Sequence, residues 1–245
     1  MYSRKKVQLL VGQDIKTPSG VTRCGKMRLR SAEAVEVARW FGLDRSPRRR
    51  KRASNGPGKF DVGCVELKAG TITLLSGASG AGKSSLLREL RKRSTEQVSW
   101  IDLAGLRLGN VPIVNCFDDQ PLLETLKLLA RVGLGEAWSY LRTPLQLSEG
   151  QRFRLKLAMG LYEAMACSSA KPRAVLVCDE FAATLDRLTA MIVARCVRRT
   201  IDAHPHVAAV LATSHDDLVE ALAPDSVVHC DFGHVSLSGY DGTHG

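Results

Sequence analysis

The stretch Gly77-Ala-Ser-Gly-Ala-Gly-Lys-Ser-Ser85 decides how the rest of this chain is interpreted. It fits the pattern G-x-x-x-x-G-K-[ST], in which successive backbone N–H groups face one anion. Glycines at positions 77, 80 and 82 permit the tight turn that this arrangement needs. The β-branched and apolar run over 71–75 predicts a buried strand before the stretch, and leucines at 86, 87 and 90 predict a helix over 84–93. A strand, a glycine loop and a helix N-terminus in this order predict a phosphate-binding loop.

The side chains of this loop predict a nucleotide with its metal. Lys83 is expected to reach the β- and γ-phosphates, and the Ser84 hydroxyl is expected to ligate Mg²⁺. ATP and Mg²⁺ are therefore the expected cofactors. The loop residues predicted to bind them are Gly77, Ala78, Ser79, Gly80, Ala81, Gly82, Lys83, Ser84 and Ser85.

A pair of carboxylates follows a second apolar run. Ala174-Val-Leu-Val-Cys-Asp-Glu180 predicts a buried strand that ends in Asp179 and Glu180. A nucleotide-bound Mg²⁺ requires a carboxylate at the end of a strand beside the phosphate loop, and Asp179 is placed for that role. The next residue, Glu180, is the candidate for holding and polarising the attacking water.

The positive charge of the chain is concentrated in its N-terminal part. The whole chain has a formal net charge of +10, and residues 1–58 hold 15 Lys or Arg against 4 Asp or Glu, a net of +11. The basic run, Arg45-Ser-Pro-Arg-Arg-Arg-Lys-Arg52, cannot bury itself and is followed by turn formers, so it predicts a loop. This run could hold nucleic acid or an acidic partner, and a solvated loop without a partner fits the charge equally well.

The composition predicts a cytoplasmic globular protein. No apolar run approaches the eighteen or so residues of a membrane span, so no direct membrane insertion is expected. The first residues carry charge and little apolar sequence, which argues against a secretory signal. Seven cysteines with no C-x-x-C pair predict free thiols in a reducing compartment.

Strand-like and helix-like runs alternate, which predicts an α/β fold. The charge distribution divides the chain into a basic N-terminal extension, or part of an antiparallel β subdomain, over 1–58 and a nucleotide-binding domain over 59–245. Residues 31–41 suit either a helix or a strand, and the pattern leaves both open. A helix is expected over 122–141, broken near Gly133 and Gly135. The remaining expected strands cover 7–11, 26–30, 60–67, 98–103, 111–117 and 207–211.

Over about 59–245 the sequence resembles the ABC-class ATPases of the P-loop NTPases, because five motifs stand in that family's order. The loop over 77–85 looks like its Walker A, and Leu147-Ser-Glu-Gly-Gln151 matches its signature LSxGQ. The run ending in Asp179 and Glu180 looks like its Walker B with the catalytic glutamate. Ala183-Thr-Leu-Asp186 stands where the family keeps its D-loop, and Thr213-Ser-His215 where it keeps its switch histidine.

The resemblance implies a P-loop NTPase core of ABC type with a mixed sheet, a reduced helical subdomain over about 118–165 and a small N-terminal β-rich extension. It further implies an ATP-sandwich homodimer, in which the phosphate loop of one subunit faces Ser148, Gly150 and Gln151 of the other. His215 would contact the γ-phosphate as a second catalytic residue beside Glu180. Asp186 would link the two sites.

Two expected family residues have no clear motif around them. Gln120 stands closest to the place of the Q-loop glutamine, so it is the candidate for a further metal ligand. Phe41 and Phe60 are both candidates for stacking on adenine, and Phe41 is preferred because Arg39-Trp-Phe-Gly42 resembles the family's aromatic–glycine opening.

The biological role stays open among three hypotheses. Only 65 residues separate Lys83 from Ser148, fewer than in most transporter ATPase subunits. This shortness and the basic run favour a stand-alone soluble ATPase that couples ATP hydrolysis to a conformational change, acting on nucleic acid or a nucleoprotein. One alternative is the ATP-binding subunit of a membrane transporter. The other is a nucleotide-dependent assembly switch with an unidentified protein partner, which the presence of Glu180 and His215 disfavours.

Overall fold

The computed structural model describes residues 65, 67–94, 98–167, 173–231 and 234–239, together with two short strands nearer the N-terminus. The chain divides into two compact units, Met1–Gly56 and Pro57–Gly245. In the first unit, β1 (Arg23–Cys24) pairs antiparallel with β2 (Met27–Arg28), and β2 falls inside the strand predicted over 26–30. The predictions for 7–11, 31–41, Phe41, the basic run and Phe60 lie outside the described residues.

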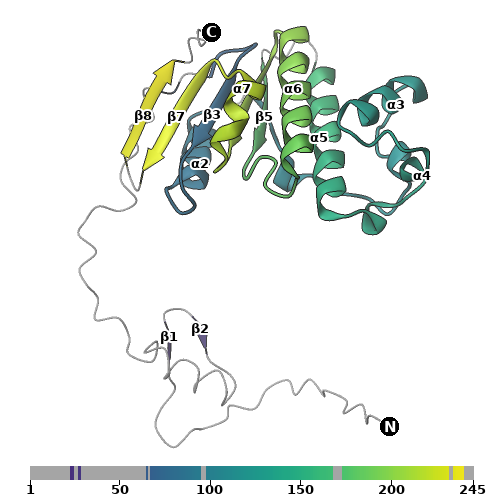
Figure 1. Cartoon of the computed structure of the whole chain (residues 1–245), viewed down its shortest axis with the longest axis horizontal. Helices are drawn as coiled ribbons and strands as arrows, with labels where there is room; N and C mark the ends of the chain where they lie inside the picture. The colour runs from purple at the N-terminus through teal and green to yellow at the C-terminus, as the bar shows by residue number, and fades with distance from the viewer. Residues whose placement is uncertain are drawn as a thin grey trace, which may run out of the picture. The chain divides into compact units, whose positions relative to one another are not determined.

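A six-stranded sheet forms the centre of the second unit, in the order β4-β5-β6-β3-β7-β8 (Figure 1). Its first five strands pair in parallel, and the last runs antiparallel to its neighbour, so the predicted α/β fold with a mixed sheet is confirmed. The strands are β3 (Ile72–Ser76), β4 (Val98–Asp102), β5 (Arg173–Cys178), β6 (Val207–Ala212), β7 (Ser226–Asp231) and β8 (His234–Gly239).

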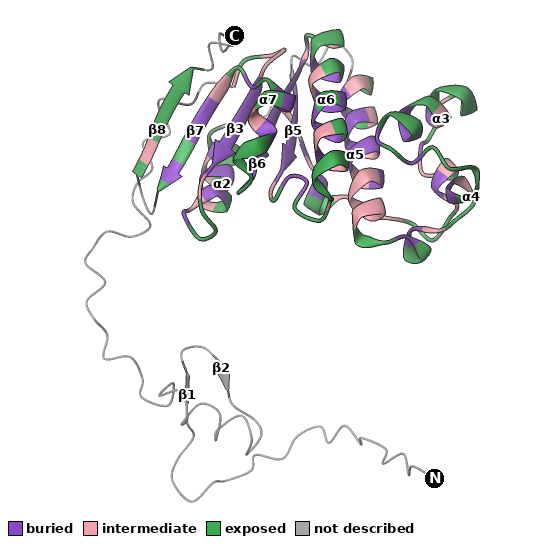
Figure 2. Ribbon diagram, viewed as in Figure 1, coloured by how far each residue is buried: buried purple, intermediate pink, exposed green. Residues whose placement is uncertain are grey.

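The centre of this sheet is covered on both faces, which is why its central strands are mostly apolar. Every residue of β3 and β6 is buried. Neighbouring residues of β3 belong to different cores: Leu74 packs in the cluster that includes residues of α5 (Glu149–Ala166) and α6 (Arg187–Ala203), and Leu75 packs with α2 (Lys83–Arg93). Figure 2 shows the buried residues along the strands and on the inward sides of these helices.

A helical segment interrupts the fold between β4 and β5. It contains α3 (Leu122–Arg131) and α4 (Ala137–Tyr140), and the predicted break near Gly133 is confirmed, because that glycine has a left-handed φ of 82°. Short helices η2 (Leu103–Gly105), η3 (Ile113–Asn115) and η4 (Pro144–Gln146) flank it, and η5 (Asp216–Leu218) and α7 (Val219–Leu222) follow β6. No helix in the described part of the chain is both long and apolar enough to cross a membrane.

The strand predicted over 111–117 is wrong. The chain there forms η3, with Pro112 at its N-cap and its carbonyl accepting from the Asn115 N–H at 2.8 Å. The Ile113 N–H donates to the Arg142 carbonyl at 2.9 Å and so cannot serve a neighbouring strand. Proline has no N–H for a sheet ladder, which explains why an apolar run here turns into a tight helix.

Candidate nucleotide-binding site

The loop over 77–82 joins the carboxyl end of the central strand β3 to the N-terminus of α2. Its three glycines all have positive φ values, 143° at Gly77, 81° at Gly80 and 107° at Gly82. Gly82 is the N-cap of α2 and offers no side-chain cap. The positive end of the helix is therefore available to an anion, as the sequence pattern predicts.

Gly77 tolerates no side chain, because a Cβ atom there would lie 2.3 Å from the Cys230 carbonyl oxygen of β7. We expect Gly77→Ala to lower the free energy of unfolding by more than the roughly 1–3 kcal/mol of left-handed strain alone, since backbone must also move. Thermal denaturation should show a melting temperature lower by about 5 °C or more. Gly105→Ala, where a Cβ meets nothing within 4 Å, is the control. Equal melting temperatures for the two variants would contradict this packing.

Lys83 is already directed at the loop that it is predicted to serve. Lys83 is only 9% exposed. Its amine donates hydrogen bonds to the Gly77 carbonyl and, at 2.9 Å, to the Ala78 carbonyl. The ammonium group is thus held across the loop by neutral acceptors. Phosphate oxygens are stronger acceptors for a cation than carbonyl groups are, so the same amine is placed to exchange these partners for a bound phosphate.

The loop, the carboxylates and the segment after β6 open onto one cavity of about 350 Å³. A cavity of this size suits a small ligand. Its lining residues are Ser79, Gly80, Gly82, Lys83, Ser84, Ser85, Asp179, Glu180, Ala183, Thr213 and Ser214. The structure therefore brings together three motifs whose lining residues lie up to 135 positions apart in the sequence, from Ser79 to Ser214.

Glu180 reaches this cavity from a strained backbone position. β5 ends at Cys178, and Glu180 has a left-handed φ of 56°. Its N–H donates to the Asp179 carboxylate at 3.1 Å. Strain of this kind persists where the surroundings hold it, and it occurs often at functional sites.

Phe181 supports this strained turn, although it belongs to none of the motifs quoted from the sequence. It is fully buried, its N–H donates to the Ala212 carbonyl at 2.7 Å, and its ring meets the Phe153 ring edge-on at 6.0 Å between centroids. A bulky apolar residue directly after the two carboxylates is the one sequence signal for this role. Through Phe153 it ties the carboxylate turn to α5.

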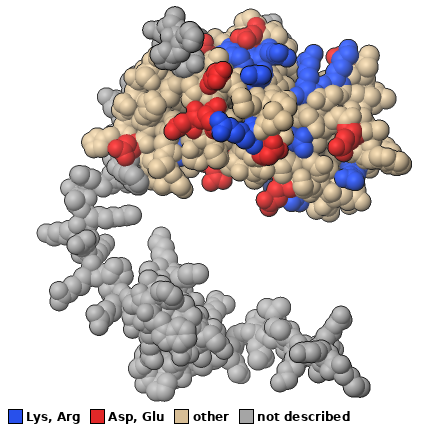
Figure 3. Space-filling view, in the orientation of Figure 1, with Lys and Arg blue, Asp and Glu red and all other residues tan. Residues whose placement is uncertain are grey.

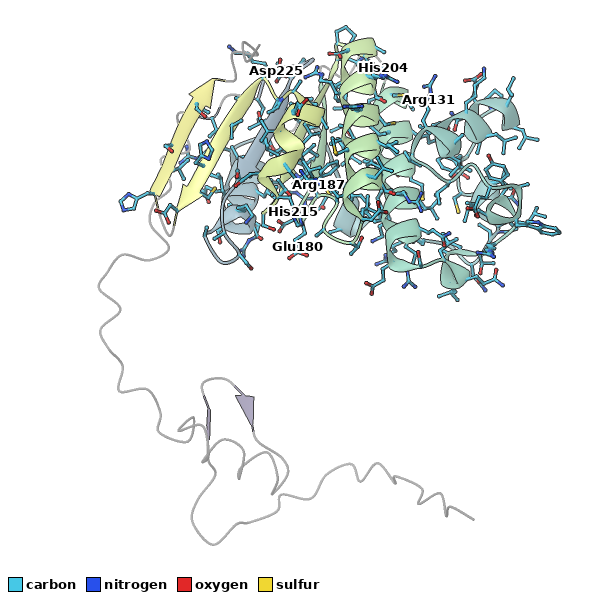
Figure 4. All side chains as sticks on the ribbon, viewed as in Figure 1. Arg131, Glu180, Arg187, His204, His215 and Asp225 are labelled. Carbon is cyan, nitrogen blue, oxygen red and sulfur yellow. The ribbon has the colours of Figure 1, made fainter. Side chains whose placement is uncertain are left out.

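The segment after β6 is joined to the end of β3. The Thr213 N–H donates to the Leu75 carbonyl at 3.0 Å, and the Thr213 hydroxyl accepts from the His215 N–H at 3.1 Å. The Ser76 hydroxyl donates to Asp216 at 2.6 Å, a contact that the sequence does not reveal. His215 is exposed and does not line the cavity, but it directly follows Ser214, which does. Figure 4 shows Glu180 and His215 at the same end of α6.

The signature residues stand outside the cavity of their own chain. Ser148 is the N-cap of α5 and accepts from the Gln151 N–H at 3.2 Å, while the Gln151 side chain accepts from the Ser148 N–H at 3.0 Å. Gly150 lies against the D-loop, because a Cβ there would meet the Leu185 side chain at 3.1 Å. Their position on an exposed helix start leaves them available to a second molecule.

Asp186 and Gln120 likewise lie outside the cavity. Asp186 is the N-cap of α6, and its hydrogen bonds with Thr189 lower the pKa of its carboxyl group. Gln120 accepts from the Thr125 hydroxyl at 3.3 Å, and the structure does not bring it to the other predicted metal ligands. Ser84 and Asp179 are the predicted metal ligands that share the cavity.

Sequence comparison finds transport proteins among the curated relatives. The chain is 32% identical over 180 residues to the aliphatic sulfonates import ATP-binding protein SsuB 1 of Xanthomonas axonopodis pv. citri. The matched region covers 62% of this chain and 67% of that protein. It is 29% identical over 212 residues to the methionine import ATP-binding protein MetN 2 of Pseudomonas aeruginosa, covering 71% of this chain. The chain spans only 59% of the length of that second relative. No family model matches the sequence.

Structural comparison finds the same architecture. The ATP-binding cassette MJ0796, solved as a dimer in a post-hydrolysis state with ADP and Pi, superimposes with a TM-score of 0.55 at 15% identity, covering 71% of this chain and 88% of that one. CbiO1 of Clostridium perfringens, part of the transporter complex CbiONQ, gives a TM-score of 0.50 at 21% identity, covering 71% and 79%. At these identities the similarity shows the fold.

Proposed function

This chain belongs to the ABC-class ATPases of the P-loop NTPases, and we propose that it binds Mg-ATP at the loop over 77–85 and hydrolyses it. The observation that carries the proposal is the shared cavity, in which Lys83, Ser84, Asp179 and Glu180 line one space. Proteins of this family hydrolyse ATP. The test is the release of phosphate from Mg-ATP by the wild-type chain and by the variant Lys83→Ala.

Each of these residues has a role that its chemistry supports. Lys83 binds phosphate oxygens in place of the Gly77 and Ala78 carbonyls. The Ser84 hydroxyl and the Asp179 carboxylate would hold Mg²⁺, since they are oxygen ligands of the kind that this ion prefers, and the ion would supply charge neutralisation at the transferred phosphate. Glu180 holds the attacking water and takes its proton.

We further propose that two copies assemble around ATP. Ser148, Gly150 and Gln151 cannot reach the cavity of their own chain as it is folded here, yet they stand at the start of α5, where a partner's nucleotide would meet backbone N–H groups and a positive helix end. Asp186, at the start of α6, would lie at the same interface. The dimeric form of MJ0796 is consistent with this arrangement.

For the biological role, the relatives favour the ATP-binding subunit of a membrane transporter over the nucleic-acid function expected from the sequence. The curated relatives named above are import ATP-binding proteins. The helical segment also exposes large apolar side chains, which mark interaction surfaces when they gather in one region. The residues of this apolar surface are Leu122, Leu123, Trp138, Leu141 and Leu145, exposed by 62–78%.

Nucleic acid remains a second candidate partner because residues 1–58 carry a net charge of +11. We expect duplex DNA to bind weakly at low salt. The logarithm of the binding constant should fall by about one unit per unit of log salt concentration for each phosphate contacted. A variant with serine in place of five basic residues should lose much of this salt dependence, as titration of labelled DNA will show. The replaced residues are Arg48, Arg49, Arg50, Lys51 and Arg52. A variant with lysine at the four arginines keeps the charge and is the control.

ATP hydrolysis decides between the two roles. For a transporter subunit, DNA or RNA should leave the rate of phosphate release unchanged within about twofold, whether or not it binds the basic run. A several-fold stimulation by nucleic acid, lost in the serine variant, would return the nucleic-acid function to first place.

A further inference from the structure

A second cavity, of about 530 Å³, lies between α6 and the end of α3. It shares no residue with the phosphate cavity. Arg187 begins α6 near Glu180 and His215, whereas Arg131 and His204 lie at the other end of this helix (Figure 4). The α6 residues that line this cavity begin at Ile192, so the cavity runs along the helix away from the turn that carries Glu180. The residues lining the α3–α6 cavity are Arg131, Ile192, Arg195, Cys196, Arg199, Thr200, Ala203 and His204.

The cavity is strongly basic and has no acidic residue in its lining. Arg195 and Arg199 stand four residues apart on one face of α6, where two like charges repel each other, and Arg131 faces them from the last turn of α3. None of these three arginines forms an ion pair within the described part of the chain. Figure 3 shows Lys and Arg side chains gathered over α6 and the helices beside it.

Arg198, on the same helix, has a structural role that the arginines of the cavity do not share. It pairs with Asp202 at 2.5 Å and with Asp225 at 2.8 Å, and its side chain is only 16% exposed. The arginines of the cavity are exposed and have no such acidic partners among the described residues. Their charge is therefore available to a ligand.

The rest of the lining suits the non-ionic part of a small molecule. Ile192, Cys196 and Ala203 are apolar, and burial raises the pKa of the Cys196 thiol, so this group adds no negative charge. The Thr200 hydroxyl donates to the Cys196 carbonyl at 2.9 Å and is already occupied. His204 Nδ1 donates to the Thr200 carbonyl at 2.8 Å, which leaves Nε2 for a ligand.

We propose that the α3–α6 cavity binds a small organic anion, whose phosphate or carboxylate group is held by Arg131, Arg195 and Arg199. A guanidinium group matches either oxyanion with two parallel hydrogen bonds. The cavity volume lies in the range of ligand sites, and the apolar lining accepts the body of the molecule. Such an anion is either a free solute or the headgroup of an anionic lipid.

The first test titrates inorganic phosphate and citrate into the full chain with saturating Mg-ADP, which occupies the phosphate loop. We expect calorimetry to show binding of at least one probe to wild type, with affinity reduced tenfold or more in Arg195→Gln/Arg199→Gln. The matched control, Arg107→Gln/Arg142→Gln, changes two exposed arginines that line neither cavity and should bind as wild type does. The basic run is the same in all these proteins, so it does not contribute to the difference between them.

A second variant separates the cavity from its surface charge. Ala203→Trp fills the space without removing an arginine, and it should also lose the probe, while circular dichroism confirms that each variant is folded. Flotation with phosphatidylglycerol vesicles, against phosphatidylcholine vesicles, identifies the source of the anion. Binding to the anionic vesicles that requires Arg195 and Arg199, without binding of either soluble probe, assigns the site to a lipid headgroup. The proposal is overturned if neither probe nor vesicle distinguishes the Arg195/Arg199 variant from its control.

Discussion

Lys83→Ala is expected to abolish measurable binding of Mg-ATP, lowering affinity by about 100-fold or more, and with it ATP hydrolysis. The Lys83 amine is the buried cation of the phosphate cavity, and removing one member of a buried charge pair with a ligand has effects of this size. Isothermal titration with Mg-ATP measures the affinity, and phosphate release measures the activity.

The control is Lys92→Ala on the same helix, whose exposed amine pairs with Glu89 at 3.4 Å. It removes the same charge and should leave nucleotide affinity unchanged. The Lys83 amine also joins the Gly77 and Ala78 carbonyls, so thermal denaturation should accompany the titration to show that the variant is folded. A folded Lys83→Ala protein that binds Mg-ATP tightly would refute the assignment of the phosphate loop.

Glu180→Gln is expected to keep Mg-ATP binding and to lower the rate of hydrolysis by about 10²–10⁴-fold. Glutamine has the shape of glutamate and can adopt the same left-handed backbone, but it cannot take a proton from water. Because hydrolysis no longer removes the nucleotide, the ATP-bound dimer should accumulate. Single-turnover hydrolysis and size-exclusion chromatography with light scattering measure the two effects.

Glu220→Gln serves as the matched control, since Glu220 is exposed on α7 and lines neither cavity. It should hydrolyse ATP as wild type does and remain in the wild-type assembly state. A Glu180→Gln protein that stays monomeric at saturating Mg-ATP would exclude the proposed homodimer. Wild-type hydrolysis by that variant would instead favour a different catalytic base, and hydrolysis by neither wild type nor control would favour an assembly switch.

Local patterns in the sequence predict the parts of the site that depend on local geometry. The glycines of the phosphate loop and the carboxylates after β5 have this character, because a turn or a strand end needs particular residues at particular spacings. Phe181 contacts Phe153, and Ser76 contacts Asp216, across long stretches of sequence, so a local pattern does not show which residues are partners.

Two further features of the structure also differ from the sequence-based expectation because they depend on contacts between distant segments. The apolar run over 111–117 resembles a strand in hydrophobicity, but Pro112 and the hydrogen bond from Ile113 to Arg142 commit it to another structure. The α3–α6 cavity requires Arg131 from one helix and Arg195 and Arg199 from another. Only the folded chain brings the end of α3 beside α6 and makes these three arginines a cluster.

The position of β3 in the sheet has a consequence for how the chain folds during synthesis. β3 is the first strand of the six-stranded sheet to be synthesised, yet both of its neighbours, β6 and β7, are synthesised after β4 and β5. The Ile72 N–H donates to the Asp225 carboxylate, which is synthesised 153 residues later. At ordinary rates of translation that interval is roughly 8–30 s, and for most of it this largely apolar strand has neither partner. Nascent chains that end before β6 will therefore leave β3 unpaired on both edges, and this interval is when the protein depends most on protection from aggregation.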